Sequence, residues 1–275
     1  MALGIVFVWL AFRGEDWTDF FSKLESVDAS QLALYVILFS MAHLLRIFRW
    51  GILVRALGPI KWKDILGAGA VGYMSIMLFP LRLGEFVRPY LVRGKGGVTA
   101  SGALATVVVE RVIDGLLFVA LFFLFIRLLP PSGNPAVAVV KVGAWGAGGV
   151  FLTVLTVLVA AHLNRERTVE ALRAIGNRIH KGLTIKALEL LQHFLDGLRV
   201  LPDKRRLGLF MVYTVIYWAA LGYGMKVMAD ATHMHDLDVV EGFALLTVLT
   251  VGIMVPAGPG FTGTFELALT AGFTL

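Results

Sequence analysis

This sequence has no cysteine and little charge. The absence of cysteine from its 275 residues excludes disulfide bonds and thiolate metal sites. Only 16% of the residues are charged, against about 25% in a soluble domain. Hydrophobic residues make up 58% of the chain, and the mean hydropathy is +0.80. This composition excludes an ordinary soluble enzyme and indicates an integral membrane protein.

Two sequence signals are also missing. No G-x-x-x-x-G-K-[ST] loop is present, so direct use of ATP is not expected. The first residues, "MALGIVFVWLAF", have no basic start and no small-residue cleavage site, so no cleaved signal peptide is predicted. The net charge of +6 lies mostly in loops beside apolar runs, and we therefore expect no nucleic-acid partner.

Long apolar runs are what the sequence has instead. Several approach the roughly 20 residues that cross a bilayer core. We predict an all-α, polytopic membrane protein with about six spans plus two broken helical hairpins. The candidate spans are 1–12 (short), 31–54, 103–129, 136–162, 207–228 and 241–256.

The first broken segment is 65–92, which contains "FPLRLGEFVRPYL". Basic residues flank it on both sides, and basic loops face the cytoplasm. The segment is therefore predicted to enter and leave the membrane on one side, with its turn near Pro80 to Gly84. Such backbone is tolerated only when buried in protein or facing a water-filled cavity. The alternative is a surface turn between two half-buried helices.

The second broken segment is 255–275, with Pro259, Gly260 and Gly263 as its helix-breaking residues. It follows a segment that enters from the acidic, outer side, and the two broken segments are therefore predicted to approach from opposite faces. Paired segments interrupted by proline and glycine are typical of inverted-repeat transporters with a site near the midplane. An inverted repeat is thus predicted, although chance similarity between glycine-rich membrane segments is an open alternative.

Three regions follow from this pattern. Residues 1–162 form a first membrane half, and 207–275 form a second. Between them, residues 163–206 contain two apolar faces with helical spacing, which predicts amphipathic helices at the cytoplasmic surface. Their basic faces suit anionic headgroups, but a simple connecting role is equally open.

Ionisable residues inside membrane segments need a partner or a purpose, since each costs at least about 2.5–3.5 kcal/mol on insertion scales. Arg111 and Asp114 are three apart on a helix and are expected to pair. Arg82, Glu85 and Arg88 would share one face of a helical exit limb. The candidate substrate-binding residues are Arg46, Arg49, Arg82, Glu85, Arg88, Glu110, Arg111, Asp114 and Glu266.

These charges nearly balance, with five arginines against four acids and about one positive charge left over. A cavity with paired carboxylates and a surplus guanidinium would bind a lipid phosphate, because arginine offers phosphate a planar fork. The alternatives are structural. Arg46, Arg49 and Arg88 could only reach the cytoplasmic headgroups. Glu110, Arg111 and Asp114 could form a clamp between helices without contacting substrate, and Glu266 could cap the last helix.

Four motifs occur in order: "RIFRW", "FPLRLGEFVRPYLV", "VVVERVIDGL" and "VPAGPGFTGTFE". Together they resemble the flippase-like family related to the membrane domain of lysylphosphatidylglycerol synthases. That family's pattern marks Arg49, Trp50, Pro80, Gly84, Glu85, Arg88, Glu110, Arg111, Asp114, Pro259, Gly260, Gly263 and Glu266.

The resemblance implies a multi-pass protein of the bacterial or archaeal cytoplasmic membrane that moves lipids between leaflets. Its partners would be membrane phospholipids or polyprenyl-phosphate lipids, without cofactor or metal, and homo-oligomerisation is left open. No aminoacyltransferase domain follows here, so aminoacylation is not expected. Two other functions stay open: a membrane-embedded enzyme on lipid phosphates, with Glu110 or Asp114 as base, and a non-transporting scaffold of a cell-envelope synthase.

Overall fold

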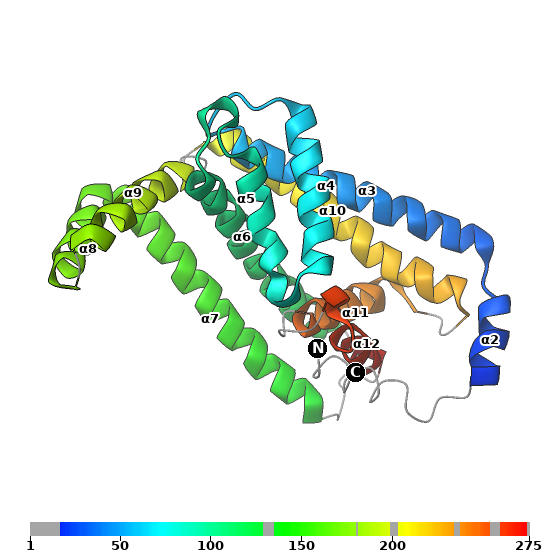
Figure 1. Cartoon of the computed structure of the whole chain (residues 1–275). Coiled ribbons are helices and arrows are strands. Elements are labelled where there is room, and N and C mark those ends of the chain that lie inside the picture. The colour runs from blue at the N-terminus through cyan, green and yellow to red at the C-terminus, as the bar shows by residue number, and fades with distance from the viewer. Residues whose placement is uncertain are drawn as a thin grey trace.

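The computed structural model describes residues 17–128, 135–179, 181–198, 203–233, 237–253 and 259–273. Within these ranges every regular element is a helix, which confirms the all-α prediction (Figure 1). The elements are α2 (Trp17–Glu25), α3 (Ala29–Val54), α4 (Trp62–Leu78), η1 (Pro80–Phe86), α5 (Val87–Val92), η2 (Lys95–Gly97), α6 (Ala100–Leu128), α7 (Pro135–Leu163), α8 (Arg165–Ile179), α9 (Lys181–Gly197), α10 (Lys204–Ala231), α11 (Val239–Gly252), η4 (Pro259–Phe261) and α12 (Thr264–Phe273).

Helices α3 and α10 form a long antiparallel pair (Figure 1). The start of α3 is tied to the end of α10, because the amide of Asp28 donates to the carbonyl of Ala231 at 2.9 Å. The Asp28 carboxylate also caps α3 by accepting hydrogen bonds from the amides of Ser30 and Gln31. This pair is the frame on which the remaining helices assemble.

Three helical stretches in the described part of the chain are long and apolar enough to cross a membrane: α3, residues 145–163 of α7, and α10. Helix α6 has 29 residues but carries three ionisable side chains near its middle, and α11 has only 14 residues. The run 1–12 lies outside the described residues. The predicted total of about six spans therefore stays a prediction.

The predicted break in the 65–92 segment is present. Helix α4 ends at Leu78, Phe79 is extended, and the 3-10 turn η1 then leads into α5, which packs back against α4. Gly84 is needed at this turn, since a Cβ there would overlap the backbone of Ser75 and Ile76. The segment is a hairpin closed by direct backbone contact, and its insertion into the membrane from one side stays a prediction.

The second broken segment also contains a turn. Gly260 and Gly263 both have positive φ, at 71° and 87°, and α12 begins directly after them. The short helix η4 contacts both α4 and η1. The two segments singled out from their prolines and glycines therefore lie against each other, although they are far apart in the sequence.

The contact between the two turns is made by Arg82 and Phe261. Each lies two residues after the proline of its segment, and each has a left-handed backbone, with φ of 57° and 56°. Such values are uncommon for residues other than glycine. The Arg82 guanidinium lies 5.1 Å from the centre of the Phe261 ring and donates to the carbonyl of Ile253 at 3.0 Å.

The stretch 163–206 contains the helices α8 and α9, in agreement with the helical spacing of its apolar residues. Its place between two membrane halves at the cytoplasmic surface stays a prediction. Each helix is amphipathic, with its apolar residues along one side. Leu195 and Leu198 are buried where α9 and the residue after it face α6. Helix α8 ends at Ile179 and helix α9 begins at Lys181. This region is anchored to α6 through its apolar face.

Replacing Gly84 with alanine tests the hairpin. We expect Gly84→Ala to lower the free energy of unfolding by about 1–3 kcal/mol, because the new methyl group overpacks the α4 backbone. Gly67→Ala is the matched control, since a Cβ at this exposed α4 position meets nothing within 4 Å. Thermal unfolding in detergent gives the comparison. Equal melting temperatures for the two variants would contradict the close approach.

Candidate functional site

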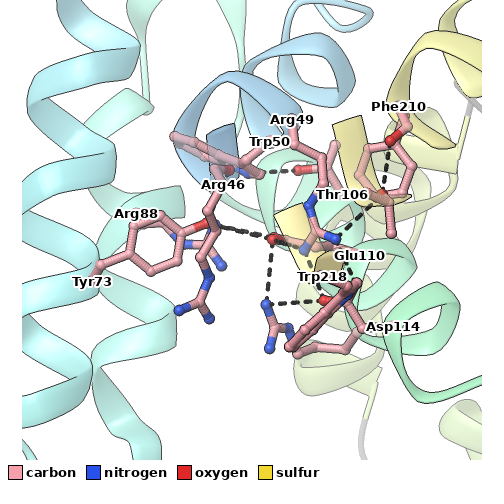
Figure 2. A network of polar contacts seen from close by, with 12 residues as sticks. Arg46, Arg49, Trp50, Tyr73, Arg88, Thr106, Glu110, Asp114, Phe210 and Trp218 are labelled. Carbon is pink, nitrogen blue, oxygen red and sulfur yellow. Dashed lines mark hydrogen bonds and ion pairs between the residues drawn. The ribbon is translucent and has the colours of Figure 1, made fainter. Parts of the chain in front are cut away.

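The side chain at the centre of the polar network is Glu110, near the middle of α6 (Figure 2). One carboxylate oxygen accepts a hydrogen bond from Arg49 Nη2 at 2.8 Å, and the other accepts from Arg88 Nη1 at 3.0 Å. The Tyr73 hydroxyl lies 3.4 Å from the first oxygen. A single carboxylate thus joins arginines from α3 and α5.

Asp114 stands one turn further along α6 and binds the same arginine. Its two oxygens accept from Arg49 Nη1 at 2.5 Å and from Nη2 at 2.8 Å, a bidentate pair. Trp218 of α10 donates its indole N–H to Asp114 at 3.3 Å. The Arg49 guanidinium is therefore held by two acids that share one face of α6.

Helices α4 and α10 make room and hydrogen-bond partners for the two arginines that bind the α6 acids. Arg88 passes Gly72 of α4, where a Cβ would overlap the arginine stem. Its Nη1 then donates to the Tyr73 hydroxyl at 2.6 Å. On the other side, Arg49 Nη1 donates to the Thr214 hydroxyl of α10 at 3.3 Å. The site is thus built from α3, α4, α5, α6 and α10.

The inner part of the network is excluded from solvent. Arg49, Arg88 and Glu110 have no exposed surface, and Asp114 is 5% exposed. Removing such ions from water is costly, and their attraction offsets that cost only when the geometry is good and further hydrogen bonds are made. The bidentate pair and the tyrosine, threonine and tryptophan partners meet this condition. We call these four charged residues the inner network.

Four more charged side chains extend the site outward. Arg111 Nη2 lies 3.3 Å from Glu110 and 3.5 Å from Asp114, and Arg111 Nη1 lies 4.0 Å from Glu85. Glu85 also pairs with Arg82 at 3.8 Å. The side chains of Arg82 and Arg111 remain 29% and 27% exposed. We call Arg46, Arg82, Glu85 and Arg111 the outer group.

Arg46 differs from the other arginines of the site. Its guanidinium lies over the Tyr73 ring at 4.1 Å from the ring centre (Figure 2). Within the described part of the chain, no carboxylate lies within 4.0 Å of it. The aromatic face offers a cation about 0.5–2 kcal/mol, which is less than full neutralisation. Arg46 therefore brings a largely uncompensated positive charge to the site.

Eight of the nine predicted site residues lie in the network or border it, and Glu266 does not. Its carboxylate accepts a hydrogen bond from the Gly263 amide at 2.6 Å, which caps α12. The charge count changes accordingly. Without Glu266, five arginines face three acids, which leaves a surplus of two positive charges instead of one. The arginines are Arg46, Arg49, Arg82, Arg88 and Arg111, and the acids are Glu85, Glu110 and Asp114.

Two local predictions can be compared with the geometry. The expected pair of Arg111 and Asp114 is present at 3.5 Å. The prediction of a helical exit limb is wrong for its first turn. Residues 80–86 form a 3-10 helix, so Arg82 and Arg88 do not share one face of an α-helix. Arg82 instead points to the second broken segment, while Arg88 is buried.

Sequence reasoning missed the neutral partners of the network. Tyr73 contacts two of the arginines, and Thr214 and Trp218 contact Arg49 and Asp114. On α10 a signal was available, since Thr214, Tyr217 and Trp218 are spaced three and four apart in an otherwise apolar helix. Polar and aromatic side chains on one stripe indicate a face that meets a buried polar group.

The donor set suits an anion rather than a metal. Guanidinium groups bind phosphate and carboxylate oxygens through paired N–H donors. In the described ranges, no three histidine, aspartate or glutamate side chains gather closely enough to hold a metal ion.

An all-helical protein with long apolar helices and a charge network buried between them is a membrane protein. The chain matches the family model of the lysylphosphatidylglycerol synthase TM region over residues 1–275, and it belongs to that family. This confirms the resemblance carried by the four motifs. No solved structure gives a significant match.

One curated relative is glycosyltransferase AglD from the archaeon Haloferax volcanii. The two sequences are 23% identical over an alignment 283 residues long, which covers 93% of this chain and 45% of the relative. The chain therefore spans less than half the length of that protein.

Removing the central carboxylate tests the inner network. We expect Glu110→Gln to lower the free energy of unfolding by about 3–5 kcal/mol, since it leaves Arg49 and Arg88 buried with too little compensation. Glu170→Gln, at an exposed α8 position, is the control and should change stability by less than about 0.5 kcal/mol. Unfolding in mixed detergent would measure both. A Glu110→Gln protein as stable as the control would show that the network is not needed for folding.

Proposed function

We propose that this protein is a lipid translocator that moves a phospholipid or a lipid-phosphate-linked substrate between leaflets. The observation that carries the proposal is a network with two levels. Its inner network is buried and paired, and its outer group is partly exposed with surplus positive charge. A rigid charged frame with an accessible, electropositive side is suited to hold a phosphate while the acyl chains stay in lipid.

The proposed substrate contacts are Arg46, Arg82 and Arg111. Arg46 lies over Tyr73 of the first broken segment, and Arg82 reaches from that segment to Phe261 of the second. Arg111 pairs with the two acids of α6. Glu85, Arg49, Arg88, Glu110 and Asp114 would keep these arginines positioned, and the three acids among them would offset three of the five positive charges. Pro80, Gly84, Pro259, Gly260 and Gly263 would shape the turns beside the headgroup, and Glu266 would support the second turn.

The membrane topology is part of the proposal. The chain would pass the bacterial or archaeal cytoplasmic membrane several times, with 65–92 entering from the inside and 255–275 from the outside. Contact between η1 and η4 supports this arrangement, because segments entering from opposite faces can touch only within the bilayer. Transport would be energy-independent or coupled to an ion gradient.

Reconstitution tests the proposal. Purified chain in liposomes should speed the exchange of fluorescent phospholipids between leaflets, read as loss of signal on adding an impermeant quencher. We expect Arg46→Gln to reduce the rate at least about tenfold, since it removes the guanidinium that has the least acidic compensation. Because Arg46 is not in the inner network, this variant should fold.

Arg93→Gln is the matched control. It removes an exposed arginine after α5 that lies over the Tyr90 ring, away from the network, and should leave the rate unchanged. Leaflet exchange at the empty-vesicle rate for every lipid class, with and without an ion gradient, would refute translocation.

An enzyme acting on a lipid phosphate is the second candidate, because the relative from Haloferax volcanii is named a glycosyltransferase. Turnover of a lipid phosphate by the purified chain, lost in Asp114→Asn, would favour this candidate. A scaffold role predicts the opposite pattern: Arg46→Gln retains function, and changes on the exposed faces of α8 and α9 abolish it.

A further inference from the structure

Several buried donors in the site have no acceptor. The Nε atoms of five arginines make no hydrogen bond in the described structure: Arg46, Arg49, Arg82, Arg88 and Arg111. Nη2 of Arg88 makes none either, whereas Nη2 of Arg111 contacts Glu110 and Asp114 as an ion pair. Buried donors in folded proteins are almost always paired. Three of these Nε donors belong to the partly exposed arginines of the outer group, Arg46, Arg82 and Arg111.

The unsatisfied donors coincide with the surplus of charge. Arg82 and Arg111 share the Glu85 carboxylate, at 3.8 Å and 4.0 Å, so these two guanidiniums lie close together. Arg46 has no carboxylate within 4.0 Å among the described residues. Like charges at such distances repel, so the outer group by itself is electrostatically unfavourable. An anion that accepts N–H groups from Arg46, Arg82 and Arg111 would relieve both the repulsion and the unsatisfied donors of these three arginines.

The size of the surplus limits the identity of the anion. A phosphodiester carries one negative charge, whereas a phosphomonoester carries about 1.5 to 2 near pH 7 and offers three acceptor oxygens. The charge of a phosphomonoester is the one that matches a surplus of two positive charges. A zwitterionic or aminoacylated headgroup would bring an ammonium group against three guanidiniums, which is unfavourable.

Apolar surface beside the outer group indicates that the anion belongs to a lipid. Leu78, Phe79, Leu83 and Phe86 flank Arg82 and Glu85 along the hairpin, and each is at least 49% exposed. Chains of a lipid can cover these side chains while its headgroup reaches the arginines.

We infer that the substrate is a lipid whose headgroup carries two negative charges, such as a phosphomonoester or a diphosphate, held by Arg46, Arg82 and Arg111. This inference rests on the proposed function, which leaves the headgroup open. It assigns the selectivity to the outer group and the positioning of that group to the inner network.

The test is binding to purified full-length chain in detergent at pH 8, measured by calorimetry with short-chain lipids. Dihexanoyl phosphatidic acid should bind at least about tenfold more tightly than dihexanoyl phosphatidylglycerol or phosphatidylcholine, because only its headgroup matches the surplus charge. Glycerol 3-phosphate, which has the same headgroup charge without chains, should compete at least about tenfold less well than phosphatidic acid.

Charge removal should change the selectivity and not only the affinity. Arg46→Gln and Arg82→Gln should each lower the ratio of phosphatidic acid to phosphatidylglycerol affinity at least about fivefold, and the double variant should abolish it. Arg93→Gln should keep the wild-type ratio. Arg111→Lys retains the charge and should retain most of the ratio, which separates charge from folding effects.

Two results would overturn the inference: equal affinity for the three lipids, or glycerol 3-phosphate competing as well as phosphatidic acid. Either result leaves translocation testable in liposomes. Conversely, selective binding with no leaflet exchange would refute translocation while supporting the assigned headgroup.

Discussion

The structure depends on the bridge that Glu110 makes between two buried arginines. Its carboxylate accepts from Arg49 on α3 and from Arg88 on α5, and all three side chains are closed off from solvent. Such a bridge fixes the distance of α3 and α5 from α6. It thereby fixes the place where the hairpin after α4 can lie, and so the place of the outer arginines.

Much of the fold follows from the apolar runs, because membrane helices are specified by length and hydrophobicity. The helix breaks follow from Pro80, Gly84 and Pro259, since each removes a donor or a side chain. The pair of Arg111 and Asp114 was predictable from local spacing. These features depend on residues close together in the sequence.

The remaining features depend on how the helices pack against one another, and the spacing of residues along the sequence does not predict that packing. Arg49 pairs with acids 61 and 65 residues away, and no local pattern selects them over Glu85 or Glu266. The charge of Glu266 suggests a place among the other ionisable residues of the site, but its carboxylate instead accepts a hydrogen bond from the Gly263 amide at the start of α12. The hydroxyl of Tyr73 was missed because tyrosine in an apolar helix is usually part of the core.

The contact of Arg82 with Phe261 has a mechanical consequence. Both residues sit in backbone that cannot relax easily, and the same guanidinium also holds the carbonyl of Ile253. If one turn shifts along the other, the stacking and the hydrogen bond break together, and Arg82 is released toward Glu85 and Arg111. A separation of the two turns would therefore change the charge around Arg82, and in a translocator that binds an anion there, opening and release would be one event.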